Sequence, residues 1–323
     1  MELQIESQAA VAVNENVFSA KETLLARFFK FAAVSANTEI TYRKSLKQMF
    51  HYFCKYDIAA PTRENLADWR DSLIDAGKSP STIQLYLTAA KVLFRWLAQE
   101  GIYSNVADHL KSRVKISTAH KKDALSLSQA NALLKYASKG NDLKSLRLKA
   151  VIALKLTSGL RDIEVVRADI CDIRQIEGRN FLFVQGKGKF DKSDCVEIAP
   201  AVMKAIQQYL KAREKAAGKK LGRREPIFVS TANRNKNSRL QTQTLSREIK
   251  AALRAVGIDS FTVTSHSLRH STACFILKNK QMTLSDVKIC LRHANLNTTL
   301  IYANTINRLN CHAEISVAKV LKI

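Results

Sequence analysis

The sequence predicts a mainly helical protein with a small β-sheet in its second half. Between residues 18 and 104, apolar residues recur every three or four positions, which is the spacing of one face of an α-helix. Between residues 168 and 199, they form short runs separated by glycine-containing turns, a pattern typical of strands. A chain of 323 residues is long enough for two domains that each bury a core.

The first domain is expected to cover residues 18–104, after a poorly ordered tail of residues 1–17. Four helices are predicted from apolar periodicity and start signals, at residues 20–34, 37–56, 61–77 and 79–101. Asn37 is the predicted N-cap of the second helix. The predicted core face of that helix consists of Ile40, Leu46, Met49, Phe50 and Phe53.

A polar, basic stretch without periodicity follows at residues 105–124, and we interpret it as a linker between the domains. It includes the basic side chains of Lys111, Arg113, Lys115, His120, Lys121 and Lys122. Two interpretations remain open. The stretch is either a solvated linker or a strap that lies along phosphate groups.

The second domain is expected to cover residues 125–323 and to mix helices with short strands. Helices are predicted at 126–137, 143–158, from 161, 200–210, 242–256, 267–279, 284–291, 298–304 and 313–320. Strands are predicted around residues 170–173, at 181–184 and 195–198, and a short extended piece at 226–229. The last helix either docks on a neighbouring protomer or packs on its own chain.

The charge of the chain indicates a polyanionic partner. The sequence has 52 basic and 28 acidic residues, a net charge of +24, and such an excess is typical of nucleic-acid binding. An anionic membrane is the competing partner, but the chain has no 18-residue apolar run and no signal-peptide pattern. We therefore expect a cytoplasmic, nucleoid-associated protein that does not bind membranes.

The six cysteines indicate neither a zinc site nor a disulfide framework, because they are scattered without CxxC spacing. We expect reduced thiols. They are Cys54, Cys171, Cys195, Cys274, Cys290 and Cys311.

Residues 264–304 contain the chemically most informative pattern. His266 and Arg269 stand three residues apart at the start of a predicted helix, so they share one face near its positive N-terminus. A neutral imidazole and a planar guanidinium there form a place for a phosphate group. His293 precedes Tyr302 by nine residues, and a phenol close to these cations is a candidate nucleophile.

Two upstream segments add further cations. Arg161 follows a glycine turn in Thr157-Ser158-Gly159-Leu160-Arg161, with Glu164 three residues later, and Lys187 lies at the tip of the hairpin 184–189. The hairpin lacks the GxxxxGK[ST] pattern, so it does not indicate ATP binding.

This ordered set resembles the tyrosine recombinases (the phage integrase family), over residues 20–312. The family pattern has an arginine in T-G-L-R-x-x-E, a hairpin lysine, H-x-x-R, then H/W and a tyrosine about nine residues on. The resemblance implies an N-terminal helical SAM-like core-binding domain, supported by T-x-x-T-Y at 38–42 and S-P-S-T-I-x-x-Y-L at 79–87. It also implies a C-terminal mixed α/β catalytic domain.

The resemblance further implies a role for each site residue. Tyr302 would attack a phosphate of double-stranded DNA and form a 3′-phosphotyrosyl link, while Arg161 and Arg269 clamp that phosphate. Lys187, with Lys189 as the fallback, would be the general acid for the departing 5′ oxygen. His266 would accept a proton and bind the phosphate, and His293 would donate a hydrogen bond to it.

No cofactor or metal is implied by this chemistry. Glu164 would support the site structurally. His266 and His270 are four residues apart, as two metal ligands on a helix can be, but no third ligand with suitable spacing is evident. Arg292 departs from the family pattern, because it replaces the usual glycine before His293.

We therefore expect a site-specific DNA recombinase that acts as a homo-tetramer on two sites, with a possible accessory or partner recombinase. The short N-terminus favours an Xer-like, transposon-like or integron-like architecture over a lambda-like one. A type IB topoisomerase-like enzyme is opposed by the compact size and the helical first domain, and an architectural DNA-binding protein by the complete catalytic set. An RNA-binding protein is opposed by the lack of an RNP-type aromatic motif.

Overall fold

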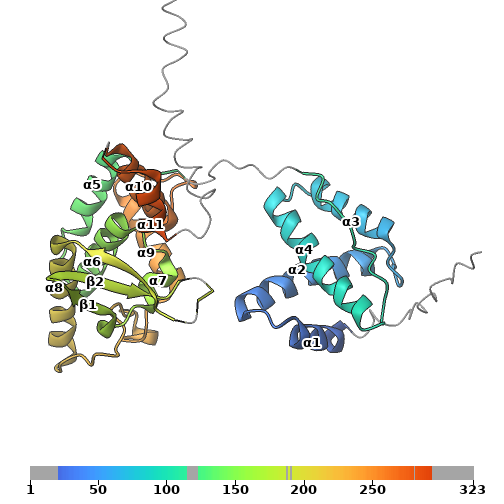
Figure 1. The fold of residues 1–323 in the computed structure, drawn as a ribbon, viewed down its shortest axis with the longest axis horizontal. Helices are drawn as coiled ribbons and strands as arrows, with labels where there is room; N and C mark the ends of the chain where they lie inside the picture. The colour runs from blue at the N-terminus through green and yellow to red at the C-terminus, as the bar shows by residue number, and fades with distance from the viewer. Residues whose placement is uncertain (1–20, 115–122, 187, 190, 280, 293–323) are drawn as a thin grey trace, which may run out of the picture. The chain divides into compact units, whose positions relative to one another are not determined.

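The computed structural model describes residues 21–114, 123–186, 188–189, 191–279 and 281–292. The chain divides into two compact units, Met1–Ser117 and Thr118–Ile323 (Figure 1). The described parts are mostly helical with one three-stranded sheet, as the sequence predicts. No helix in these parts is long and apolar enough to cross a membrane.

The first unit is built from four helices that surround one apolar core. They are α1 (Lys21–Ala32), α2 (Ala36–Lys55), α3 (Arg63–Asp75) and α4 (Pro80–Gln99). Side chains of Ser35, Thr62 and Ser79 accept backbone N–H groups and so begin α2, α3 and α4. The apolar faces meet at Trp69 and Phe94, which are fully buried.

Two details of α2 differ from the prediction. The N-cap is Ser35, which has an extended backbone and accepts the N–H of Thr38, so the assignment of Asn37 was wrong. Ile40 was predicted to be in the core but is 52% exposed. At 3.6 residues per turn, position 40 lies about 120° around the helix from Leu46, and the buried face follows Leu46.

Part of the predicted linker belongs to the first unit. Ala107 and Leu110 are buried in its core, and the backbone oxygen of Lys111 accepts a hydrogen bond from Arg70 over 3.2 Å. Arg113 pairs with Asp71 over 3.0 Å. The described residues 105–114 therefore pack against the helices, although the sequence predicted them to lie between the domains.

The second unit places α6 at its centre (Figure 1). The helix contacts α5, α8, α10 and strand β3, and half of its residues are buried, among them Arg147 and Lys155. The described helices of the second unit are α5 (Leu127–Ala137), α6 (Leu143–Ser158), α7 (Asp162–Arg167), α8 (Pro200–Ala217), α9 (Thr242–Ala255), α10 (Ser265–Lys278) and α11 (Leu284–Leu291).

The sheet is antiparallel in the order β1-β2-β3. Its strands are β1 (Ile173–Ile176), β2 (Arg179–Val184) and β3 (Asp194–Ile198), and short 3₁₀ turns lie at Ile170–Asp172 and Asn233–Asn235. Leu182 pairs with Ile173 on one side and Val196 on the other. The buried side chains of Leu182 and Val184 join the core of α6 and α8.

The extended piece predicted at 226–229 forms only isolated bridges, Asp169 with Pro226 and Val229 with Arg239. The helices predicted at 298–304 and 313–320 lie outside the described residues.

Candidate active site

A tight turn between α6 and α7 positions Arg161. Gly159 ends α6 with a left-handed backbone, φ 60°, and a Cβ atom at this position would lie 2.3 Å from a side-chain carbon of Leu291. Glycine is therefore favoured both by the backbone conformation and by the close approach of the Leu291 side chain. Arg161 follows as the N-cap of α7, with 29% of its side chain exposed.

A buried carboxylate orients Arg161. The Glu164 side chain is fully buried, and its Oε1 accepts the Arg161 guanidinium over 2.8 Å while its Oε2 accepts the Arg161 backbone N–H over 2.7 Å. Burial alone would raise the pKa of Glu164, but the charge of Arg292, followed by the hydrogen bonds and charge of Arg161, lowers it. Glu164 is therefore ionised at neutral pH.

Arg269 lies between two segments that are distant in sequence. Its guanidinium donates to the backbone oxygen of Gly159 over 2.6 Å and to that of Leu291. Only 1% of the residue is exposed. Arg269 thus joins α10 to the turn before Arg161 and to the end of α11. It also adds a buried positive charge beneath that turn.

His266 is in the first turn of α10 and is exposed to solvent on one side. Protein atoms packed around the rest of the imidazole, then the charges of Arg269 and Lys155, lower its pKa from 6.5 to about 4. The ring is therefore neutral at neutral pH and able to accept a proton. It contacts the His270 ring edge to face, with centroids 4.6 Å apart.

A buried ion pair, which sequence reasoning did not identify, supports this arrangement. Lys155, 1% exposed, donates to Asp162 over 2.6 Å and to the backbone oxygen of Leu160 over 2.9 Å. Asp162 also accepts the hydroxyls of Ser246 and Ser265 over 2.8 and 2.6 Å. The pair therefore connects α6, α7, α9 and α10. A lysine inside the apolar helix 143–158 was the available sequence signal.

The hairpin between β2 and β3 contains two lysines that form ion pairs. Lys189 pairs with Asp194 over 2.8 Å, and Lys192 pairs with Asp169 over 2.7 Å and with Asp172. Lys187 lies outside the described residues, as do His293 and Tyr302. The structure thus brings together Arg161, His266 and Arg269, and the described chain ends next to them at Arg292.

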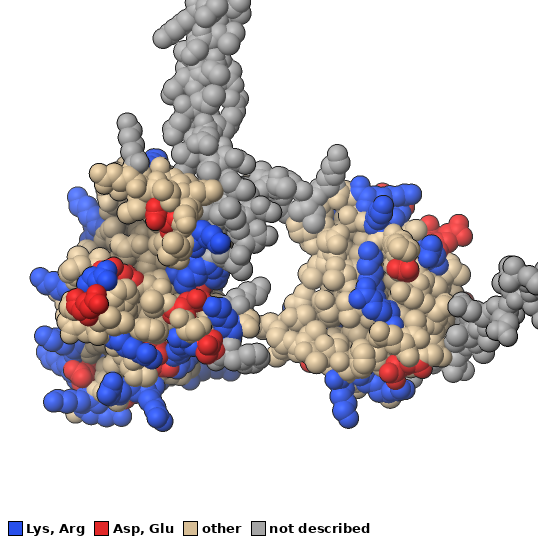
Figure 2. All heavy atoms as spheres, viewed as in Figure 1, with Lys and Arg blue, Asp and Glu red and all other residues tan. Residues whose placement is uncertain are grey.

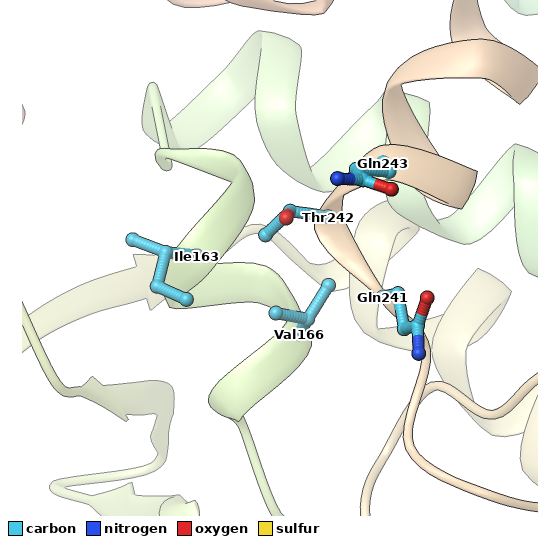
Figure 3. A pocket seen from close by; sticks show the side chains of 5 residues that line it. All are labelled: Ile163, Val166, Gln241, Thr242 and Gln243. Atoms are coloured by element: carbon cyan, nitrogen blue, oxygen red, sulfur yellow. The ribbon is translucent and has the colours of Figure 1, made fainter. Parts of the chain in front are cut away.

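A shallow hollow of about 330 Å³ lies between α7 and the start of α9 (Figure 3). Its lining residues are Ile163, Val166, Gln241, Thr242 and Gln243. It is open and carries no charged lining residue, so it does not indicate a site for a small charged molecule. In the described parts of the chain, no three His, Cys, Asp or Glu side chains are grouped as metal ligands.

Lys and Arg side chains gather along the edge of the second unit where α8 lies (Figure 2). Lys204, Lys211 and Lys215 of α8 are exposed. Two nearby carboxylates are engaged, since Glu214 accepts the N–H of Leu221 and Glu225 pairs with Arg213. The exposed lysines make this edge positive, in keeping with a polyanionic partner.

Comparison with known families identifies the fold. Residues 123–308 match the profile of the phage integrase family, and residues 24–101 match the N-terminal SAM-like domain of phage integrases. The first match alone covers more than half of the chain. The chain belongs to the phage integrase family. The SAM-like match corresponds to α1–α4, and the other covers all described helices and strands of the second unit.

Individual members of this family are similar over most of their length. The tyrosine recombinase XerD of Oceanobacillus iheyensis is 29% identical over 286 residues, covering 86% of this chain and 92% of the relative. The structure of the XerH site-specific recombinase bound to a palindromic difH substrate, a post-cleavage complex, aligns with a TM-score of 0.71 at 19% identity, covering 94% of this chain and 85% of that one. The lambda integrase tetramer bound to a Holliday junction aligns with a TM-score of 0.62 at 21% identity, covering 87% and 76%.

Proposed function

We propose that this protein cleaves and rejoins double-stranded DNA at specific sites, with Tyr302 as its nucleophile. Members of the phage integrase family are tyrosine-type site-specific recombinases, and so is this chain. The observation that supports the assignment of the site is the convergence of Arg161, His266 and Arg269. Arg269 bonds a carbonyl 110 positions away, at the turn that carries Arg161, and Arg292 ends the described chain one residue before His293.

The reaction begins when the Tyr302 oxygen attacks the phosphorus atom. The P–O5′ bond breaks, a 3′-phosphotyrosyl bond forms, and neutral His266 takes the phenol proton. Binding of the phosphate anion raises the pKa of this imidazole from its low value and so favours the transfer. Lys187 gives a proton to the departing 5′ oxygen. The 5′ hydroxyl of a partner strand then reverses these steps, and no nucleotide cofactor is needed because one phosphodiester replaces another.

The two arginines stabilise the negative charge that develops on the phosphate in different ways. Arg161 is the more exposed of the two, with 29% of its side chain open to solvent, and it contacts the non-bridging oxygens directly. Arg269 is buried, so it contributes its charge from below while it fixes the turn at Gly159. Arg269 and Glu164 are buried among protein atoms, and this setting of low dielectric strengthens the field at the phosphate.

The test of the nucleophile is a nicked suicide substrate that carries DNA flanking the gene. Wild type and Tyr302→Phe are incubated with it, and the products are separated on a denaturing gel. We expect a slow protein–DNA band with wild type only, at equal DNA binding. An adduct that persists in Tyr302→Phe would assign the nucleophile to another residue.

Lys187 is the proposed general acid because the ammonium of the alternative, Lys189, is already paired with Asp194. Lys187→Ala should slow cleavage, and a 5′-bridging phosphorothiolate should restore it, since a thiolate leaves without a proton. Lys189→Ala is the matched control in the same loop. Rescue confined to Lys189→Ala would move the general acid two residues along the hairpin.

We further propose that four protomers assemble on two sites, by analogy with the lambda integrase tetramer on a Holliday junction. Mass photometry with a single site and with a synthetic four-way junction tests this assembly. Four protomers on the junction are expected. Covalent adduct without strand exchange and without tetramers would instead favour topoisomerase-like cleavage and religation.

A further inference from the structure

Arg292 occupies a backbone conformation that favours glycine. It ends α11 with φ 54° and ψ 48°, in the left-handed region. An L-residue there is less stable than glycine by about 1 kcal/mol, because its Cβ crowds the backbone. The chain nevertheless has arginine at this position, so contacts of the arginine side chain must offset the unfavourable backbone conformation.

The side chain of Arg292 is directed into the protein and is only 7% exposed. One terminal nitrogen donates to Glu164 Oε2 over 2.9 Å, and the other donates to the backbone oxygen of Cys290 over 2.6 Å. Its Nε has no hydrogen-bond partner among the described residues. Glu164 is the carboxylate that also binds Arg161 through Oε1.

We propose that Arg292 is a positioning residue for DNA cleavage, which acts on Arg161 through the carboxylate of Glu164. The inference rests on the proposed function, in which Arg161 contacts the phosphate. The contact also fixes α7, which follows Arg161, to the end of α11, immediately before His293. One side chain therefore connects these two segments of the proposed site.

The charges give the reason for this arrangement. A carboxylate bound only to Arg161 would neutralise it, and the pair would attract a phosphate weakly. Shared between two guanidinium groups, the same carboxylate leaves a net charge of +1 beside the phosphate. Arg269 adds further positive charge nearby. Arg292 thus keeps Glu164 ionised and rigid while Arg161 remains available to the substrate.

The first experiment measures single-turnover cleavage of the suicide substrate at saturating DNA. Arg292→Gly should relieve the backbone strain and remove the contact, and we expect cleavage to slow about 10- to 100-fold, the effect of losing one charged hydrogen bond. DNA affinity should change less than threefold. Arg292→Lys, which keeps the charge, should recover part of the rate. Arg254→Ala, which removes one charge from an exposed pair with Asp259, is the control and should cleave like wild type.

A double-mutant cycle tests whether Arg292 acts through Glu164. In the Glu164→Gln background, Arg292→Gly should slow cleavage less than twofold further. If Glu164→Gln does not fold, the cycle uses Arg161→Lys, whose ammonium lacks the planar fork of the guanidinium, and the same loss of effect is expected. If Arg292→Gly slows cleavage as much in the variant background as in wild type, Arg292 acts independently of this carboxylate, and the proposal is wrong.

Wild type is the reference that separates the two hypotheses. If wild type forms no covalent adduct, the proposed function fails. If wild type forms the adduct and Arg292→Gly cleaves at the same rate, the proposed function stands and the role of Arg292 is refuted.

Discussion

Removal of the Asp162 carboxylate should destabilise the second unit far more than loss of a surface charge. In Asp162→Ala, the ammonium of Lys155 keeps only the backbone oxygen of Leu160, at a position 1% exposed to solvent. Breaking a buried ion pair by removal of one partner costs about 3–5 kcal/mol, because the remaining charge is left without compensation. Total stabilities are about 5–15 kcal/mol, so the predicted effect is a large fraction of the whole.

The two units can be followed separately in urea. Both tryptophans of the chain, Trp69 and Trp96, are buried in the first unit. Their fluorescence therefore reports the first unit, while far-UV circular dichroism reports both. With a urea m-value of about 2 kcal/mol/M, the dichroism transition of the second unit should shift down by about 1.5–2.5 M. The fluorescence transition should not move.

Two variants check the reasoning. Lys155→Met/Asp162→Ala removes both charges and should recover much of the lost stability. Asp259→Ala, which breaks an exposed pair with Arg254, should leave both transitions in place. A shift for Asp162→Ala no larger than that for Asp259→Ala would refute the claim that the buried pair holds α6, α7 and α10 together. An equal shift in fluorescence would refute the independence of the two units.

Three further predictions concern ionisation and binding. In the free protein, the His266 imidazole should titrate by NMR with a midpoint near its pKa of about 4 rather than 6.5, with His266→Gln to assign the signal. Because the pKa of His266 is lower in the folded than in the unfolded protein, the stability contributed by this group is present above pH 6.5 and is lost as pH falls towards 4. An NMR midpoint above pH 6 would contradict the packing around the ring. A thiol reagent at pH 7.5 should modify exposed Cys54 and Cys195 before Cys274 and Cys290, because burial raises the pKa values of the latter two thiols. Peptide mass spectrometry measures the order of labelling, and early labelling of Cys274 or Cys290 would contradict this prediction. The affinity for a duplex should fall about 10³- to 10⁵-fold between 50 and 200 mM salt if six to ten phosphates are contacted, whereas a nearly flat dependence in fluorescence anisotropy would argue against phosphate-dominated binding.

Local patterns in the sequence determined most of the helices. The apolar runs predicted helices at 143–158 and 284–291, and α6 and α11 have these bounds. The family also followed from sequence, because the pattern around Arg161 and His266 depends on short spacings. Periodicity and end signals act over a few residues, so they can be recognised without knowledge of the fold.

Tertiary structure alone decided how the site is held together. The sharing of Glu164 by Arg161 and Arg292, the burial of Arg269 and the pairing of Lys155 with Asp162 are not visible in the sequence. The contact of Arg292 with Glu164 spans 128 positions, and that of Arg269 with Gly159 spans 110. Residue spacing sets which side chains share a face of one helix, but packing between distant segments sets which charge faces which carboxylate, and therefore which arginine remains open to a phosphate.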